Sequence, residues 1–275
     1  MKSREINKTW TVSAEQESPI HKVGMVLQPG HFEDYDPFLF LAEDWFQRGV
    51  FDFHPHRGME TVTYIIEGIL EHSDNHGGAG RLNPGDTQWM TAGRGIIHKE
   101  DPAIGETVHS LQLWLNLPAA KKMTETRYQD LQSANMPLRE EPGAKVRVFS
   151  GTSGGVTATT LNHVPVTMVE ITLEPGATIS QDLPGSYNGF IYVLEGRGVF
   201  GAKETEGKKN QVLWTNPTGD NEESEITITA IEPLKLVLFA GQPLHEPIVA
   251  YGPFVMNTEQ EIRQAYADFR SGKFN

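Results

Sequence analysis

The sequence contains no cysteine, so disulfide bonds, thiolate metal ligands and cysteine nucleophiles are all excluded. It also lacks any run of lysine and arginine longer than a pair, and its formal net charge is −13. A chain with this charge has no electrostatic footprint for a phosphate backbone, so we expect no direct binding to nucleic acid. No apolar run is long enough to span a bilayer, and the first ten residues lack the apolar region of a signal peptide. We therefore expect a cytoplasmic protein that does not bind membranes.

Turn-forming residues are abundant: the 275 residues include 27 glycines and 17 prolines. Short runs rich in valine, isoleucine, threonine and tyrosine recur between them, and Glu60–Gly68 is the clearest example. This pattern is typical of strands joined by turns. The sequence therefore predicts an all-β protein, and its length allows one large domain or two of moderate size.

One segment near the end of the chain has helical rather than strand periodicity. Thr258–Glu261 has the sequence of a capping box, in which a threonine and a glutamate close the first turn of a helix. Ile262, Ala265, Tyr266 and Phe269 then form one apolar stripe at helical spacing. We expect a single amphipathic helix that packs against the β-structure.

A short internal repeat indicates that the chain has two related halves. Tyr64–Gly68 recurs as Tyr192–Gly196, and each copy ends a predicted strand in a glycine turn. Its similar placement in each half favours duplication, which predicts two β-barrels in tandem. Residues 118–143 are polar and proline-bearing, with helical propensity from Lys121 to Asp130, and we expect them to connect the halves.

Two pairs of polar residues in the first half have the spacing of metal ligands. His54 and His56 lie two apart, so on a strand both imidazoles point to one face, and Glu60 is at even spacing from both. His98 and Glu100 repeat this geometry downstream. Neutral imidazole is the commonest protein ligand for a transition metal. Joined across a barrel, the two pairs predict a site of three histidines and one glutamate.

The second half cannot rebuild this ligand set. No histidine lies between His163 and His245. Aligning the repeat without gaps puts other residue types at the positions of the first two histidines and of Glu60, namely Asp182, Pro184 and Asn188. If the halves are homologous, only the first should hold a metal.

The segment His109–Leu117 alternates cleanly between leucine and other residues. Its second face, with Gln112 and Trp114 among its members, lines a ligand pocket or is simply solvated, and the pattern does not decide between the two. The remaining histidines of this half are expected to be surface or packing residues: His72, His76 and His109. Arg57, beside the first pair, is expected to pair with a carboxylate.

Longer motifs resemble known proteins. The HxH pair with its carboxylate, followed by Gly95-x-x-His98, is similar to the two motifs of cupins. Several further stretches resemble the pirin family within that superfamily, and they run through most of the chain: residues 36–39, 54–64, 84–100, 112–118, 243–249 and 251–258.

The resemblance implies a fold and a ligand set. The fold is two tandem cupin (jelly-roll) β-barrels with a C-terminal helix, comprising a metal-binding domain at residues 1–130 and a degenerate cupin domain at 131–275. One divalent metal per chain would be held by the family ligands His54, His56, His98 and Glu100. Glu60 then becomes a structural residue or one that supports the ligands. The family favours Fe(II), whereas the ligand types alone also suit Mn, Ni, Co, Cu or Zn.

The resemblance also implies an activity. A pirin-like metal-dependent dioxygenase would cleave flavonols such as quercetin with O2, with Glu100 accepting the proton of the substrate hydroxyl. The substrate is then a small aromatic compound, and we expect Gln112, Trp89 and Met90 to form the pocket wall. The alternative is a metal-dependent regulatory protein that binds transcription factors or metabolic enzymes. The acidic charge is compatible with such protein partners.

Overall fold

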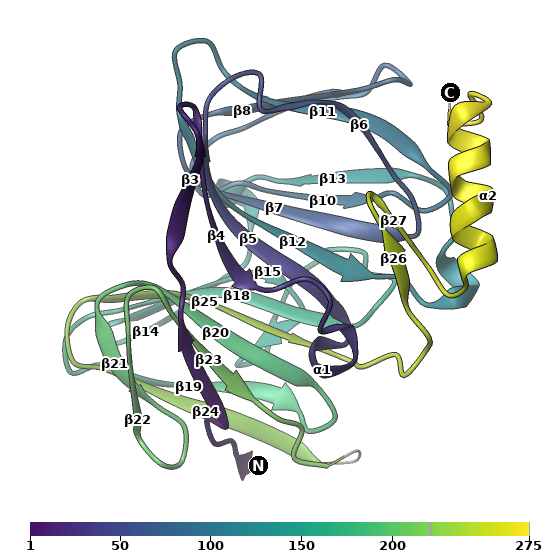
Figure 1. Cartoon of the computed structure of the whole chain (residues 1–275). Helices are drawn as coiled ribbons and strands as arrows, with labels where there is room; N and C mark the ends of the chain where they lie inside the picture. Colours follow the sequence, from purple (N-terminus) through teal and green to yellow (C-terminus); the bar gives the residue numbers. More distant parts are fainter. Residues whose placement is uncertain (220–221, 275) are drawn as a thin grey trace. The chain divides into compact units, whose positions relative to one another are not determined.

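The computed structural model describes residues 1–219 and 222–274, and these form two compact units. The first, here called the N-barrel unit, contains residues 14–134 and 244–274. The second, the C-barrel unit, contains residues 1–13 and 135–243. Both are built almost entirely of strands (Figure 1), so the all-β prediction is confirmed. None of the helices in the described ranges has the length and apolar character needed to cross a membrane.

The N-barrel unit contains two antiparallel sheets. The larger has the order β13-β10-β7-β12-β5-β4-β3 and the smaller the order β6-β11-β8-β9. Phe46 and Ile65 of the larger sheet pack against Leu70 and Leu82 of the smaller one, so an apolar core lies between them. The strands of the larger sheet are β3 Ala14–Ser18, β4 His21–Leu27, β5 Phe38–Phe46, β7 Met59–Glu67, β10 Thr87–Thr91, β12 Val108–Asn116 and β13 Arg127–Leu131. Those of the smaller sheet are β6 Phe51–His56, β8 Leu70–Asp74, β9 Ala79–Leu82 and β11 Ile96–Pro102.

The C-barrel unit has the same plan. A seven-stranded sheet has the order β14-β15-β18-β25-β20-β23-β2, and a second sheet has the order β1-β24-β21-β22 with β19 also paired to β24. The large-sheet strands are β2 Lys8–Thr11, β14 Leu138–Glu141, β15 Ala144–Ser150, β18 Val166–Leu173, β20 Asn188–Glu195, β23 Gln211–Thr215 and β25 Leu234–Gly241. The others are β1 Lys2–Ser3, β19 Thr178–Pro184, β21 Arg197–Phe200, β22 Thr205–Lys208 and β24 Glu223–Ala230, with a separate pair β16 Thr152–Ser153 and β17 Val156–Thr157.

The interior of the C-barrel unit is aliphatic. Val169 and Ile171 of the large sheet pack with Ile226 and Ile228 of the smaller one in a single buried cluster. The two units together have the tandem cupin architecture, as expected.

The end of the chain forms a hairpin and a helix in the N-barrel unit: β26 Val249–Tyr251, β27 Phe254–Met256 and α2 Glu259–Arg270. The capping box is confirmed, because the Thr258 hydroxyl accepts the Glu261 backbone N–H at 3.2 Å. Ile262 and Ala265 of the apolar stripe are buried against the hairpin residue Phe254. The other helical segments are short: α1 Phe32–Tyr35 and the 3-10 turns η1 Ala119–Lys121 and η2 Ser133–Asn135.

The predicted helical propensity from Lys121 to Asp130 is wrong. The 3-10 turn η1 ends at Lys121, where the predicted segment begins, and the segment's second half is the strand β13, which pairs antiparallel with β10 over Arg127–Leu131. Pairing with a sheet edge satisfies the backbone of this polar segment and outweighs its local propensity. The compact units also differ from a single division after residue 130, since residues 1–13 group with the second barrel and 244–274 with the first.

Candidate metal centre

Three histidines meet where strands β6 and β11 pair. The register places His98 directly opposite His54, and His56 follows two residues later on β6 with its side chain on the same face. One nitrogen from each ring can be chosen so that all three lie within 4.8 Å of one another. The ring centroids are 4.5 Å apart for His54 and His98, and 5.1 Å apart for His56 and His98.

The imidazole nitrogens at this point have the properties of metal ligands. His56 is 3% exposed and His98 is 0% exposed, and burial lowers the pKa of both rings well below the usual value, with the neighbouring histidines adding to the effect. Both rings are therefore neutral. Among the described residues, neither ring nitrogen of His98 has a hydrogen-bond partner, and Nδ1 of His56 also has none. Buried polar atoms are rarely left unpaired, so a bound cation is the natural partner.

The orientation of His54 agrees with this reading. Its Nδ1 lies 2.7 Å from the backbone carbonyl oxygen of Asp52. A neutral ring donates its N–H there, which leaves Nε2 as the nitrogen with a lone pair. Ligating histidines commonly donate their other N–H to a carbonyl or carboxylate in this way.

Glu100 stands next to the histidine group. A β-bulge in the pairing with β6 separates it from His98. Its Oε2 accepts a hydrogen bond from Gln112 Nε2 at 2.9 Å, and its Oε1 accepts one from Thr63 Oγ1 at 3.3 Å. The carboxylate is therefore held by two strands of the larger sheet. It lies outside the group of nitrogens within 4.8 Å, and its role as the fourth ligand stays a prediction.

Glu60 is engaged elsewhere. Its Oε2 accepts the indole N–H of Trp89 at 3.0 Å and its Oε1 accepts the hydroxyl of Thr91 at 2.6 Å. Burial raises the pKa of Glu60, while these two donors act in the opposite direction. Both carboxylate oxygens of Glu60 thus accept hydrogen bonds from side chains of β10, and neither of these two side chains is a predicted metal ligand.

The three predicted pocket residues lie in different surroundings. Gln112 contacts Glu100 and is beside the centre. Trp89 is fully buried and contacts Glu60, whereas Met90 is buried with Ala92 and Ile96. Their role in a pocket wall stays a prediction, and only Gln112 is brought to the predicted ligands by a hydrogen bond.

The remaining histidines of the first half have other partners. His72 Nε2 is 3.3 Å from an Asp130 carboxylate oxygen, and His109 Nε2 is 2.8 Å from one of Glu43. His76 is exposed. None of them belongs to the group of three, as we expected.

Two residues near the centre were not among the predicted site residues, although Trp114 belongs to the face of His109–Leu117 for which the sequence left a pocket open. Trp114 lies on the same face of β12 as Gln112, and its ring centroid is 5.1 Å from that of His56. Thr63, the second hydrogen-bond donor to Glu100, lies opposite Gln112 in the pairing of β12 with β7. The alternation of His109–Leu117 was the available signal, since it places Gln112 and Trp114 on one face; their contacts show that this face points inward.

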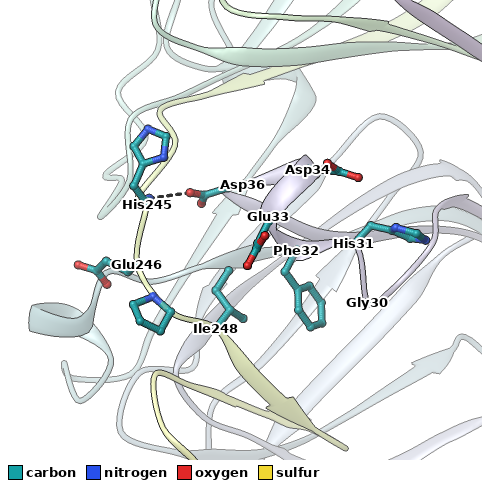
Figure 2. Close-up of a pocket in the computed structure, with 10 residues that line it drawn as sticks. Gly30, His31, Phe32, Glu33, Asp34, Asp36, His245, Glu246 and Ile248 are labelled. Atoms are coloured by element: carbon teal, nitrogen blue, oxygen red, sulfur yellow. Dashed lines mark hydrogen bonds between the residues drawn. The ribbon is translucent and has the colours of Figure 1, made fainter.

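A separate cleft of about 780 Å³ lies between α1 and the segment 245–248. Figure 2 shows its walls, including Asp36, whose Oδ2 accepts the backbone N–H groups of Leu244 and His245 at 2.7 Å each. None of the four predicted ligands lines this cleft. Asp36 therefore ties two distant segments of the N-barrel unit together.

Comparison with known proteins identifies the family. The family model described as Pirin matches residues 20–115, and the one described as Pirin C-terminal cupin domain matches residues 168–275. The pirin-like protein of Solanum lycopersicum is 43% identical over 243 residues, which cover 88% of this chain and 82% of that protein. This chain belongs to the pirin family.

Two solved structures are similar to this chain over 90% or more of its length. The crystal structure of GK1651 from Geobacillus kaustophilus has 60% sequence identity and a TM-score of 0.88, covering 90% of this chain and 99% of that one. Quercetin 2,3-dioxygenase from Acinetobacter baumannii is 31% identical with a TM-score of 0.86, covering 99% of this chain and 98% of that one.

Proposed function

We propose that this pirin is a metal-dependent dioxygenase that cleaves flavonols, in the manner of a quercetin 2,3-dioxygenase. The observation that carries the proposal is the group of three imidazoles with a fixed carboxylate beside it. Two of the three, His56 and His98, are buried and have nitrogens without a hydrogen-bond partner among the described residues. The similarity in sequence and fold to the Acinetobacter baumannii quercetin 2,3-dioxygenase supports it.

The residues present fit a transition metal. His54, His56, His98 and Glu100 would hold it, and four protein ligands leave one or two positions open on an octahedral ion. When bound, such an ion would polarise a coordinated hydroxyl and support chemistry with O2. We propose one Fe(II) per chain, while Mn, Ni, Co, Cu and Zn also suit these ligand types.

The side chains around the centre would hold the substrate proton and exclude water. Glu100 is the base for the flavonol hydroxyl proton, and Oε1 is the oxygen best able to accept it. Its bond from Thr63 is long at 3.3 Å, whereas the Gln112 bond to Oε2 is 2.9 Å. Gln112 thereby keeps the carboxylate oriented. The near-complete burial of His56 and His98 keeps bulk water away from this point.

The test is turnover of quercetin by Fe(II)-loaded protein with and without O2. We expect loss of the flavonol absorbance and release of carbon monoxide in air, and neither under argon. His98→Ala, which removes a buried ligand, should abolish both. A wild-type protein with stoichiometric iron that leaves quercetin unchanged in air would refute the proposed activity.

A second candidate is a metal-dependent interaction protein. Phe53 is 56% exposed and directly precedes His54, so an apolar side chain lies on the surface of the strand that carries two of the histidines. In this reading, metal occupancy would alter the surface that a protein partner meets. Partner capture that is the same for wild type and a metal-free His54→Ala variant would exclude metal-dependent binding.

A further inference from the structure

Trp114 belongs to two environments at once. On one side its ring meets that of His56 edge to face, with centroids 5.1 Å apart and an interplanar angle of 88°. On another it lines a cleft of about 270 Å³ together with Phe32, Leu39, Phe40, Ala250 and Val255. All of these residues lie in the N-barrel unit. The cleft that Trp114 lines therefore adjoins a predicted metal ligand through this one side chain.

The chemistry of the cleft favours a flat aromatic ligand. The ring of Phe40 lies 4.5 Å from that of Trp114, and no charged side chain within the described ranges lines the cleft. Aromatic walls of this kind bind planar rings by offset or edge-to-face packing. The volume is close to the lower end of the range for ligand pockets, about 300 Å³, which suits a single ring system.

The indole N–H of Trp114 is a hydrogen-bond donor without a partner among the described residues. Its Nε1 atom is buried. Buried tryptophan usually finds a partner for this group, and an unpaired donor is unfavourable. An oxygen of a ligand bound beside His56 would satisfy it.

We propose that Trp114 is the positioning residue for the substrate: it holds one aromatic ring system of the substrate in this cleft and donates its indole N–H to a ligand oxygen near the metal centre. The inference rests on the proposed function and adds to it the residue that sets substrate specificity. The inference concerns substrate binding, so it can be tested by measuring quercetin binding to metal-free protein.

The experiment compares Trp114→Phe with Ala250→Leu, which adds bulk to the cleft from the β26–β27 hairpin. Trp45→Phe is the matched control, because Trp45 stacks on His109 at 4.3 Å and does not line the cleft. Quercetin binding to metal-free protein is measured by calorimetry. We expect each cleft variant to weaken binding about tenfold, and the control to match wild type.

The iron-loaded proteins provide a second readout. Iron content should be unchanged in all three variants, and KM should rise in the two cleft variants, because the lost contacts are made in the bound ground state. Circular dichroism checks that the variants are folded. Should Trp114→Phe fail to fold, Ala250→Leu alone decides the inference.

The outcomes separate this inference from the proposed function. Trp114-dependent quercetin binding without turnover would leave the inference standing and remove the dioxygenase proposal. Turnover of quercetin with unchanged binding and KM in both cleft variants would support the dioxygenase proposal and overturn the inference. Absence of quercetin binding by wild-type protein, with or without iron, would overturn the inference.

Discussion

At the scale of single residues, Gln112 is the group that fixes Glu100, through a 2.9 Å hydrogen bond to Oε2. Gln112→Ala leaves only the longer bond from Thr63, so the carboxylate becomes mobile. We expect the affinity for Fe(II) to fall by about 10- to 100-fold, as is usual when a partner of a ligand is removed. A chelator competition titration measures this, with Gln260→Ala on the exposed face of α2 as control. Equal affinities for wild type and Gln112→Ala would show that Glu100 needs no such support.

Residue spacing predicted the three histidines because strand periodicity alone puts such pairs on one face. It could not separate Glu60 from Glu100, since both have even spacing from a histidine. What separates them is tertiary: Trp89 of β10 binds Glu60, and Gln112 of β12 binds Glu100. Partners on other strands have no signature in a local pattern.

At the scale of elements, α2 is tied to the residue that directly follows β6, the strand that carries two of the histidines. Arg57, directly after His56, donates to Asp268 of α2 at 2.9 Å, which confirms the expected pairing of Arg57 with a carboxylate. Hydrogen bonds from Lys273, Arg57 and Gln264 hold the pKa of Asp268 below its usual range. Asp268→Asn should therefore lower stability at pH 7 by about 1 kcal/mol.

The pH dependence of this effect has a definite sign. A carboxylate whose folded pKa is depressed stabilises the fold above its unfolded value of about 3.9, and this contribution is lost as pH falls through the folded pKa. The difference between wild type and Asp268→Asn should therefore be full at pH 7 and shrink below about pH 4. Thermal melts measure it. Glu259→Gln on the same helix, an exposed partner of Arg263, should change little, and an effect equal to that of Asp268→Asn would argue against α2 docking through Asp268.

Among the elements, α2 could be predicted because its cap and its stripe are local signals that agree. β13 could not, because its polar sequence becomes a strand only through the edge of β10. For the same reason, the sequence could not predict that residues 1–13 group with the second barrel and residues 244–274 with the first. Thr9 pairs with Leu213 of β23, and the helix stripe packs on Phe254, and both contacts are distant in sequence.

At the scale of the whole molecule, the two barrels have the same plan but different interiors. The repeat that aligns Tyr64 with Tyr192 puts Ile191 at the position of Thr63. The sheet register then pairs Thr63 with Gln112 in the N-barrel unit, and Ile191 with Leu238 in the C-barrel unit. Ile191 and Leu238 belong to the aliphatic core of the C-barrel unit. Where one barrel fixes a carboxylate, the other is filled with apolar side chains.

This contrast predicts the metal content of the chain. An aliphatic interior offers no ligand to a cation and would impose a large desolvation penalty on it. Elemental analysis of protein loaded with Fe(II) and then desalted should therefore give one metal per chain. His98→Ala should reduce the content to near zero, whereas Asp182→Ala, at the position matching His54 in the second half, should leave it at one. Two metals per chain, or a loss on Asp182→Ala, would mean that the C-barrel unit has kept a site, contrary to what its aliphatic core indicates.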